Sequence, residues 1–268
     1  MTSTSPPHGQ TFRVFVINLE SQTARWDFQQ HQLASRGLSH ERVIACDKNH
    51  PAVARQDGYW DSWQRPLLPS ERACLLSHQS VWEIIAQGQS PGLVLEDDVV
   101  LSREIAPTLA LLAQFQDVEH ISLETRGRKK LLSKQRWPVG DHQWLRRLYL
   151  DRTGAAAYVL WPAGAQRLLA ESKVRCGLAD AMICGSAALK SYQLEPAAAI
   201  QSDQCERYRL PVVLKTTSSI TPSHTAPHHK NFRQKLRRIT AQLEMAWRQC
   251  RRLISSQRDF VGINAQMF

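Results

Sequence analysis

The chain has 268 residues, 43% of them hydrophobic and 22% charged, which suits one large domain with an appendage and excludes a wholly disordered chain. Its net charge of +10 is unevenly spread, because residues 224–258 hold nine lysines and arginines against one acid. The body before that segment is therefore close to neutral, and we expect no nucleic-acid partner for it.

The six cysteines include no CxxC pair, which argues against a zinc site built from cysteines. Residues 1–10 are polar and lack the apolar core of a secretory signal, and no apolar run approaches the length of about 20 residues that spans a membrane. We expect a disordered segment over residues 1–11, reduced thiols and a cytoplasmic location.

The first predicted elements are a strand, a helix and a second strand. Residues 13–19 are β-branched, aromatic and continuous, as in a buried strand. Residues 23–36 read as a helix that ends before Gly37, and residues 42–46 read as another strand. This βαβ order indicates a parallel sheet.

A longer helix follows, with Ser70 as the expected N-cap and Glu71 in the first turn, where the helix dipole favours an acid. The dipeptide at 91–92 ends it, and residues 93–95 begin a third strand.

Strands and helices continue to alternate along the rest of the body. Further strands are expected at 118–123 and 154–160, and further helices at 105–115, 163–172 and 179–189. The basic stretch 127–141 is expected to be a mobile loop. We therefore predict an α/β fold over residues 12–221, with a mixed, mostly parallel sheet flanked by helices.

Three consecutive acids, Glu96, Asp97 and Asp98, end the apolar strand at 93–95. Adjacent carboxylates repel one another and are costly to desolvate, so a bound divalent cation such as Mg²⁺ or Mn²⁺ is one resolution. Strand alternation puts Glu96 and Asp98 on one side, as the expected metal ligands. Asp97 lies on the other side, where it is expected to serve catalysis by positioning substrate, or to brace a neighbour. The alternative is a solvated turn after an edge strand.

Several short motifs follow one another between residues 12 and 220. They are Val16-Ile17-Asn18-Leu19 with Arg25, Ala45-Cys46-Asp47, Glu71-Arg72-Ala73-Cys74-Leu75-Leu76-Ser77-His78, Leu95-Glu96-Asp97-Asp98, Ala157-Tyr158 with Gly164-Ala165, Asp180, and Pro196 with Gln201. Together these motifs resemble glycosyltransferase family 25, the lipopolysaccharide-type sugar transferases. Lys48 departs from the pattern, since relatives usually carry glycine there.

The resemblance implies a GT-A-like (Rossmann-like) fold, a UDP-sugar donor, commonly UDP-galactose, and a saccharide or lipid-linked acceptor. It also implies inversion at the anomeric carbon, for which Asp180 is the candidate general base. Asp180 also fits a helix N-terminal acid that serves the dipole alone.

The donor site is expected to draw on five residues, each with a structural alternative. They are Asn18, Arg25, Asp47, Ser77 and His78. Arg25 could hold a phosphate or only solvate its helix, and Asp47 could bind ribose or only end a strand. His78 beside apolar neighbours could equally be a core histidine, and Tyr158 is expected in the core.

The segment 222–268 is predicted to be a basic tail. Between 231 and 254 apolar residues recur at helical spacing with arginines on the opposite face, a pattern typical of an amphipathic helix on an anionic membrane. The same pattern suits a helix packed on the domain. The leading hypothesis is a metal-dependent hexosyltransferase at the inner face of the cytoplasmic membrane; the alternative is a non-enzymatic membrane- or nucleic-acid-binding protein acting through this tail.

Overall fold

The computed structural model describes residues 12–151, 154–212 and 254–268, together with residue 214 and isolated positions between 239 and 252. The expected disorder of residues 1–11 and nearly all of the expected helix at 231–254 lie outside these residues. No described helix is long and apolar enough to cross a membrane.

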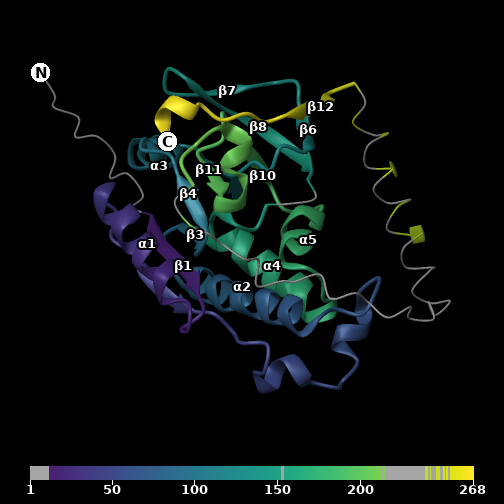
Figure 1. Ribbon diagram of the computed structural model, residues 1–268. Helices are drawn as coiled ribbons and strands as arrows, with labels where there is room; N and C mark the ends of the chain where they lie inside the picture. The colour runs from purple at the N-terminus through teal and green to yellow at the C-terminus, as the bar shows by residue number, and fades with distance from the viewer. Residues whose placement is uncertain are drawn as a thin grey trace, which may run out of the picture.

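A ten-stranded mixed sheet forms the centre of the molecule (Figure 1). Its strands are β1 (Arg13–Asn18), β2 (Glu41–Ile44), β3 (Gly92–Glu96), β5 (His120–Ser122), β6 (Lys129–Ser133), β7 (Trp137–Val139), β8 (Gln143–Leu150), β9 (Ala157–Leu160), β10 (Ser191–Glu195) and β12 (Ser256–Phe260). The strand order is β12-β6-β8-β10-β5-β9-β3-β1-β2, and β7 pairs with β8. A separate pair joins β4 (Val99–Leu101) to β11 (Ala199–Gln201).

The directions of the strands decide which strand ends lie at the same edge of the sheet. β1 pairs in parallel with β2 and β3, and β5 pairs in parallel with β10. β9 runs antiparallel to both β3 and β5, so β5 points the same way as β1. The carboxyl ends of β1, β2, β3 and β5 therefore share one edge of the sheet. The predicted α/β class and mixed sheet are confirmed.

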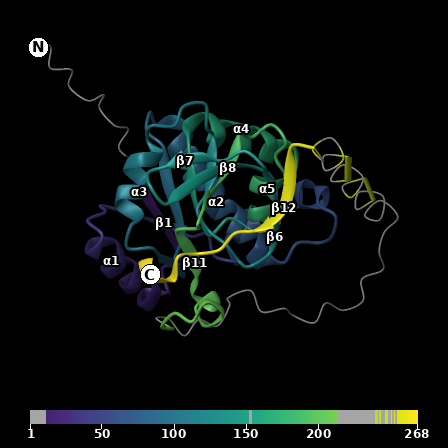
Figure 2. The same cartoon turned by 90° about the horizontal axis from the view of Figure 1, so that it is seen from above.

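Helices cover both faces of the sheet (Figures 1 and 2). The helices are α1 (Thr23–Ser35), α2 (Pro69–Gln87), α3 (Ile105–Leu112), α4 (Pro162–Val174) and α5 (Ala179–Gly185). Val14 and Val16 belong to a core shared with α1 and α3, whereas Phe15 and Ile17 belong to a core shared with α2, α4 and α5. The continuous apolar run of β1 thus serves two cores, as expected for a strand buried on both faces.

The start of α2 differs from the prediction. The N-cap is Leu68, not Ser70, and Pro69 occupies the first turn. Proline is favoured there because its missing N–H would have no partner in the helix and its fixed φ suits the first turn. Glu71 lies in the first turn as predicted, and its Oε2 accepts a hydrogen bond from the Leu68 N–H at 2.9 Å.

The basic stretch 127–141 is not a loop throughout, and that prediction was wrong. It contains β6, which pairs with β8 and β12, and β7, which pairs with β8. The stretch reads as polar because it includes Lys130, but that lysine is buried and forms an ion pair with Asp151 at 2.6 Å.

The last residues return to the body. β12 adds an edge strand beside β6, and Ile263 forms a bridge with Ala197. The chain ends near α3, where the Arg103 N–H donates to the Met267 carbonyl oxygen at 2.6 Å (Figure 1). Residues 256–268, which the sequence groups with the basic tail, are thus attached to the sheet.

Candidate functional site

A cavity of about 470 Å³ opens at the edge where β1, β2 and β3 end. Predicted site residues from four parts of the chain line it: Arg25, Asp47, Ser77, His78, Glu96, Asp97 and Asp98. Ligands of open α/β sheets bind beyond the carboxyl ends of strands, so this is the position that the fold favours for a site.

Glu96 and Asp98 lie close to one amide. The Gln201 Nε2 donates to Glu96 Oε2 at 3.3 Å and lies 3.4 Å from Asp98 Oδ1. β3 ends at Glu96, and the next two residues form a turn that leads into β4. Burial, and then the charges of Glu96 and Asp97, raise the pKa of Asp98 to about 7. The two carboxylates repel each other in a partly desolvated place, which is a setting that a cation would relieve.

Asp97 faces the other way, towards α1. Its Oδ2 accepts from Asn18 Nδ2 at 2.7 Å, and its Oδ1 pairs with Arg25 Nη1 at 2.9 Å. Burial raises the pKa of Asp97, although Arg25 and Asn18 oppose that shift. These contacts match the bracing role considered for Asp97; its catalytic role stays a prediction.

Asn18 is 1% exposed and is not among the residues that line the cavity. Its Oδ1 accepts from Arg42 Nε at 3.0 Å while its amide nitrogen donates to Asp97. Asn18 therefore supports the acidic turn from behind, and direct contact with a nucleotide stays a prediction.

His78 and Ser77 are both buried on α2 yet border the cavity. His78 Nε2 lies 3.3 Å from Glu96 Oε1, and Nδ1 lies 2.9 Å from Tyr158 Oη. Tyr158 is fully buried, as predicted. Ser77 Oγ accepts from the Cys46 N–H at 2.8 Å, so it ties α2 to the segment after β2. His78 is thus buried, as in a core position, and also borders the cavity, as in a site position.

Asp180 lies in a neighbouring cavity of about 220 Å³. The two cavities share lining residues, namely Cys74, Glu96, Arg126 and Gln201. Asp180 lies in the first turn of α5, which is the helix-start position considered for it, and its Oδ1 accepts from the Ala181 N–H at 2.7 Å. Burial raises the pKa of Asp180 to about 6, with a smaller contribution from Glu96.

Three residues of the site were not among the predicted site residues: Glu124, Arg126 and Gln201. Glu124 is 1% exposed and lines the smaller cavity, and burial raises its pKa to about 7. Arg126 borders both cavities and donates to Gln201 and Asp203. For Glu124 and Arg126 the signal was present, because they come just after the predicted strand at 118–123, whose carboxyl end reaches the same edge. Gln201 ends the short strand β11, which was not predicted.

Comparison with known proteins identifies the family of the chain. Residues 12–183 match the family described as "Glycosyltransferase family 25 (LPS biosynthesis protein)". A "Glycosyltransferase 25 family member" of Anopheles gambiae is 28% identical over 182 residues, which cover 59% of this chain and 28% of the relative.

An "Inactive glycosyltransferase 25 family member 3" of Homo sapiens is 31% identical over 183 residues, covering 60% of this chain and 29% of the relative. The chain thus spans less than a third of the length of these relatives. Because the family match covers most of the chain, from β1 to α5, the protein belongs to glycosyltransferase family 25.

Proposed function

We propose that the protein is a metal-dependent, inverting glycosyltransferase that moves a hexose, galactose from UDP-galactose, onto a lipopolysaccharide or lipooligosaccharide acceptor. The observation that carries this proposal is the pair Glu96 and Asp98. Among the described residues, neither forms an ion pair with a lysine or arginine, although both border a cavity of about 470 Å³. Glu96 contacts His78 Nε2 at 3.3 Å, and both acids contact the Gln201 amide. Partly desolvated acids that no lysine or arginine neutralises fit a cation from outside the chain.

The donor atoms of this pair suit a hard cation. Carboxylate oxygens are the ligands that Mg²⁺ and Mn²⁺ prefer, and we assign Glu96 and Asp98 as the ligands. When bound, the ion neutralises charge that develops on the leaving diphosphate. Arg25, Lys48 and Arg126 line the same cavity and supply positive charge for the diphosphate.

The nucleoside is assigned to the region of Asp47. A further cavity of about 840 Å³ adjoins the first and shares Leu19, Ala45, Cys46 and Asp47 with it. Uridine would lie there, with Asp47 in reach of ribose hydroxyls and the diphosphate directed towards Glu96 and Asp98. The donor would then lie at the carboxyl ends of β1 and β3, where open α/β sheets bind their ligands, as expected for a GT-A-like fold.

Asp180 is assigned as the general base. Its carboxylate takes the proton of an acceptor hydroxyl, the acceptor oxygen forms a bond to the anomeric carbon, and the bond from that carbon to the diphosphate oxygen breaks. UDP leaves with the electron pair. The smaller cavity, which holds Asp180 and shares Glu96 with the donor cavity, would receive the acceptor hydroxyl.

The acceptor class and the cellular location rest on the family description and the sequence. A lipid-linked acceptor would place the enzyme at the inner face of the cytoplasmic membrane, where each basic residue near an anionic leaflet contributes about 1 kcal/mol. The basic segment 231–254 would make that contact.

A non-catalytic role is the second candidate, since relatives from human and cattle carry the word "inactive" in their names. In that case the chain would act through binding, including binding by its basic tail. Deleting residues 222–254 separates tail functions from body functions, because residues 256–268 remain to complete the sheet.

The experiment that tests the proposal is release of UDP from UDP-galactose by the full chain, with Mn²⁺ or with a chelator. We expect turnover that needs the metal and is lost in Asp98→Asn, while Asp117→Asn retains it. Asp117 is an exposed acid that precedes β5 at the opposite edge, so it is a matched control. Turnover that is indifferent to metal and to Asp98→Asn would refute the assignment.

A further inference from the structure

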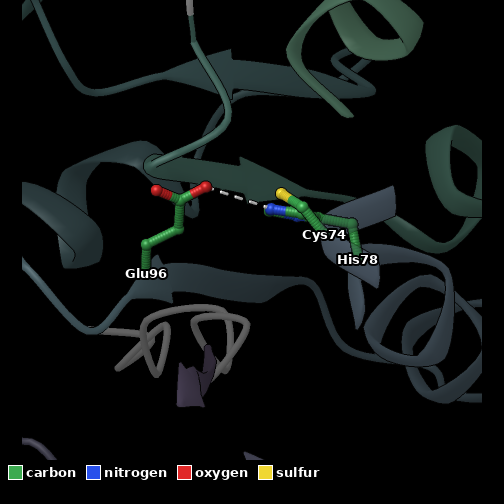
Figure 3. A group of neighbouring side chains, drawn as sticks. All are labelled: Cys74, His78 and Glu96. Carbon is green, nitrogen blue, oxygen red and sulfur yellow. Dashed lines mark hydrogen bonds and ion pairs between the residues drawn. The ribbon is translucent and has the colours of Figure 1, made fainter. Parts of the chain in front are cut away.

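Glu96 of the pair Glu96 and Asp98 also lies close to two side chains of different chemistry, Cys74 and His78 (Figure 3). The Cys74 thiol and the His78 imidazole come from α2, and the Glu96 carboxylate comes from the end of β3. One ligand-type atom from each lies within 4.8 Å of the other two. Figure 3 shows the thiol and the imidazole directed towards the carboxylate.

From this geometry we propose a second metal site, formed by Cys74, His78 and Glu96, that takes a borderline ion of the Zn²⁺ class. Sulfur and imidazole ligands favour such ions over Mg²⁺ or Mn²⁺, which prefer oxygen. The site is therefore chemically distinct from the pair Glu96 and Asp98, although Glu96 belongs to both. The absence of a CxxC pair does not bear on it, because one cysteine suffices.

The spacing of the ligand atoms suits tetrahedral coordination. Cys74 and His78 are four residues apart, so they stand on one face of α2. His78 Nε2 and Glu96 Oε1 are 3.3 Å apart. With ordinary zinc bond lengths, nitrogen and oxygen ligands of a tetrahedral ion are separated by about 3.4 Å. The pair is thus already at the required distance, and the thiol lies within 4.8 Å of both atoms.

The surroundings of His78 supply the support that metal-bound histidines have. Tyr158 Oη lies 2.9 Å from His78 Nδ1, and Trp82 Nε1 donates to the same oxygen at 2.8 Å. A histidine that binds metal through one nitrogen is oriented by a partner on the other. Tyr158 fills that role here: Trp82 holds the tyrosine oxygen, and the tyrosine oxygen contacts His78, which is 1% exposed.

A fourth position is open to a ligand from outside the chain. Cys74 and Glu96 line both the cavity of about 470 Å³ and the cavity of about 220 Å³. Three protein ligands with one open position are typical of zinc sites that bind water or substrate. On binding, the ion displaces the thiol proton, which goes to the buffer.

Cobalt substitution tests this site directly, because a thiolate on tetrahedral Co²⁺ gives a near-ultraviolet charge-transfer band. The full chain, reduced and freed of metal, is titrated with Co²⁺. We expect the band to saturate at one ion per chain and to vanish when Zn²⁺ is added. Cys74→Ser should abolish the band, whereas Cys46→Ser, at a cysteine that lines the same large cavity, should retain it.

Two further variants refine the result. Tyr158→Phe should keep the band but weaken Zn²⁺ binding about 10–100-fold, the usual cost of losing a supporting contact. Asp98→Asn should keep it, because Asp98 belongs to the other site. No thiolate band in the folded wild type, or a band that survives Cys74→Ser, would overturn the proposal. The zinc site does not rest on sugar transfer, so missing turnover would count against the proposed function alone.

Discussion

Buried charges are handled differently in two regions of this sheet. Around β6 and β8 each buried cation has an acid: Lys130 pairs with Asp151 at 2.6 Å, and Arg146 pairs with Asp259 at 3.1 Å. At the end of β3, Glu96 and Asp98 contact the Gln201 amide, and Glu96 also contacts the His78 imidazole, but neither acid pairs with a lysine or arginine of the described residues. The first region is neutralised within the chain and supports the fold, whereas we propose that the second binds a ligand.

The largest effect on stability should come from removing the buried ion pair between Lys130 and Asp151. Lys130→Met removes the cation that pairs with Asp151 inside the sheet, so we expect the free energy of unfolding to fall by about 3–5 kcal/mol. Denaturant titration measures the change. Lys129→Met, at the exposed neighbour in β6, is the control and should change it by less than about 0.5 kcal/mol. Equal losses in the two variants would show that the buried pair has no special weight.

Asp180→Asn should remove catalysis while leaving the fold intact. The asparagine oxygen can still accept the Ala181 N–H, but the side chain no longer takes a proton. We expect turnover to fall about 10²–10⁴-fold, the range for losing a general base, with UDP binding retained. Retained transfer would reduce Asp180 to a helix-start residue and move the base to another acid of the smaller cavity.

The proposed role of Asp180 as the base also predicts a pH dependence. Burial raises the pKa of Asp180 to about 6, and a base must be ionised, so kcat/KM should fall as the pH drops through about 6. Below that value we expect a tenfold loss per pH unit. A rate profile between pH 5 and pH 8 at saturating Mn²⁺ tests this, and a flat profile would exclude Asp180 as the base.

The smallest effect concerns how Asp98, in the turn after β3, changes the stability of the fold. The pKa of Asp98 is raised, so its ionised form weakens the folded state above about pH 7, and that loss is relieved as the pH falls below 7. In metal-free protein at pH 8, Asp98→Asn should raise the free energy of unfolding by about 1 kcal/mol or more. A decrease would mean that Asp98 is held by a partner in the chain and does not await a cation.

The sequence predicts the parts of the site that depend on local order. β1 and β3 are continuous apolar runs that end in polar residues, so the position of Asn18, Glu96 and Asp98 follows from the rule that parallel strands share an edge. Alternation also anticipates that Asp97 turns away from Glu96 and Asp98.

Other parts depend on contacts between distant segments. Gln201 reaches the acids because β11 pairs with β4, and a three-residue strand has too little pattern to be recognised. The strand β6 is missed because Lys130 makes its sequence look exposed. A lysine can be predicted as buried only when its partner, Asp151, is known. The contact between His78 and Tyr158 spans 80 residues and likewise needs the folded chain.

The central claim is that Glu96 and Asp98 hold a divalent ion that binds the donor diphosphate. Isothermal titration of UDP into the wild type and Asp98→Asn, with Mn²⁺ and with chelator, tests it most directly. We predict that Mn²⁺ strengthens UDP binding to the wild type and that Asp98→Asn removes this gain while its melting temperature is retained. UDP binding of equal strength in all four titrations would contradict the claim.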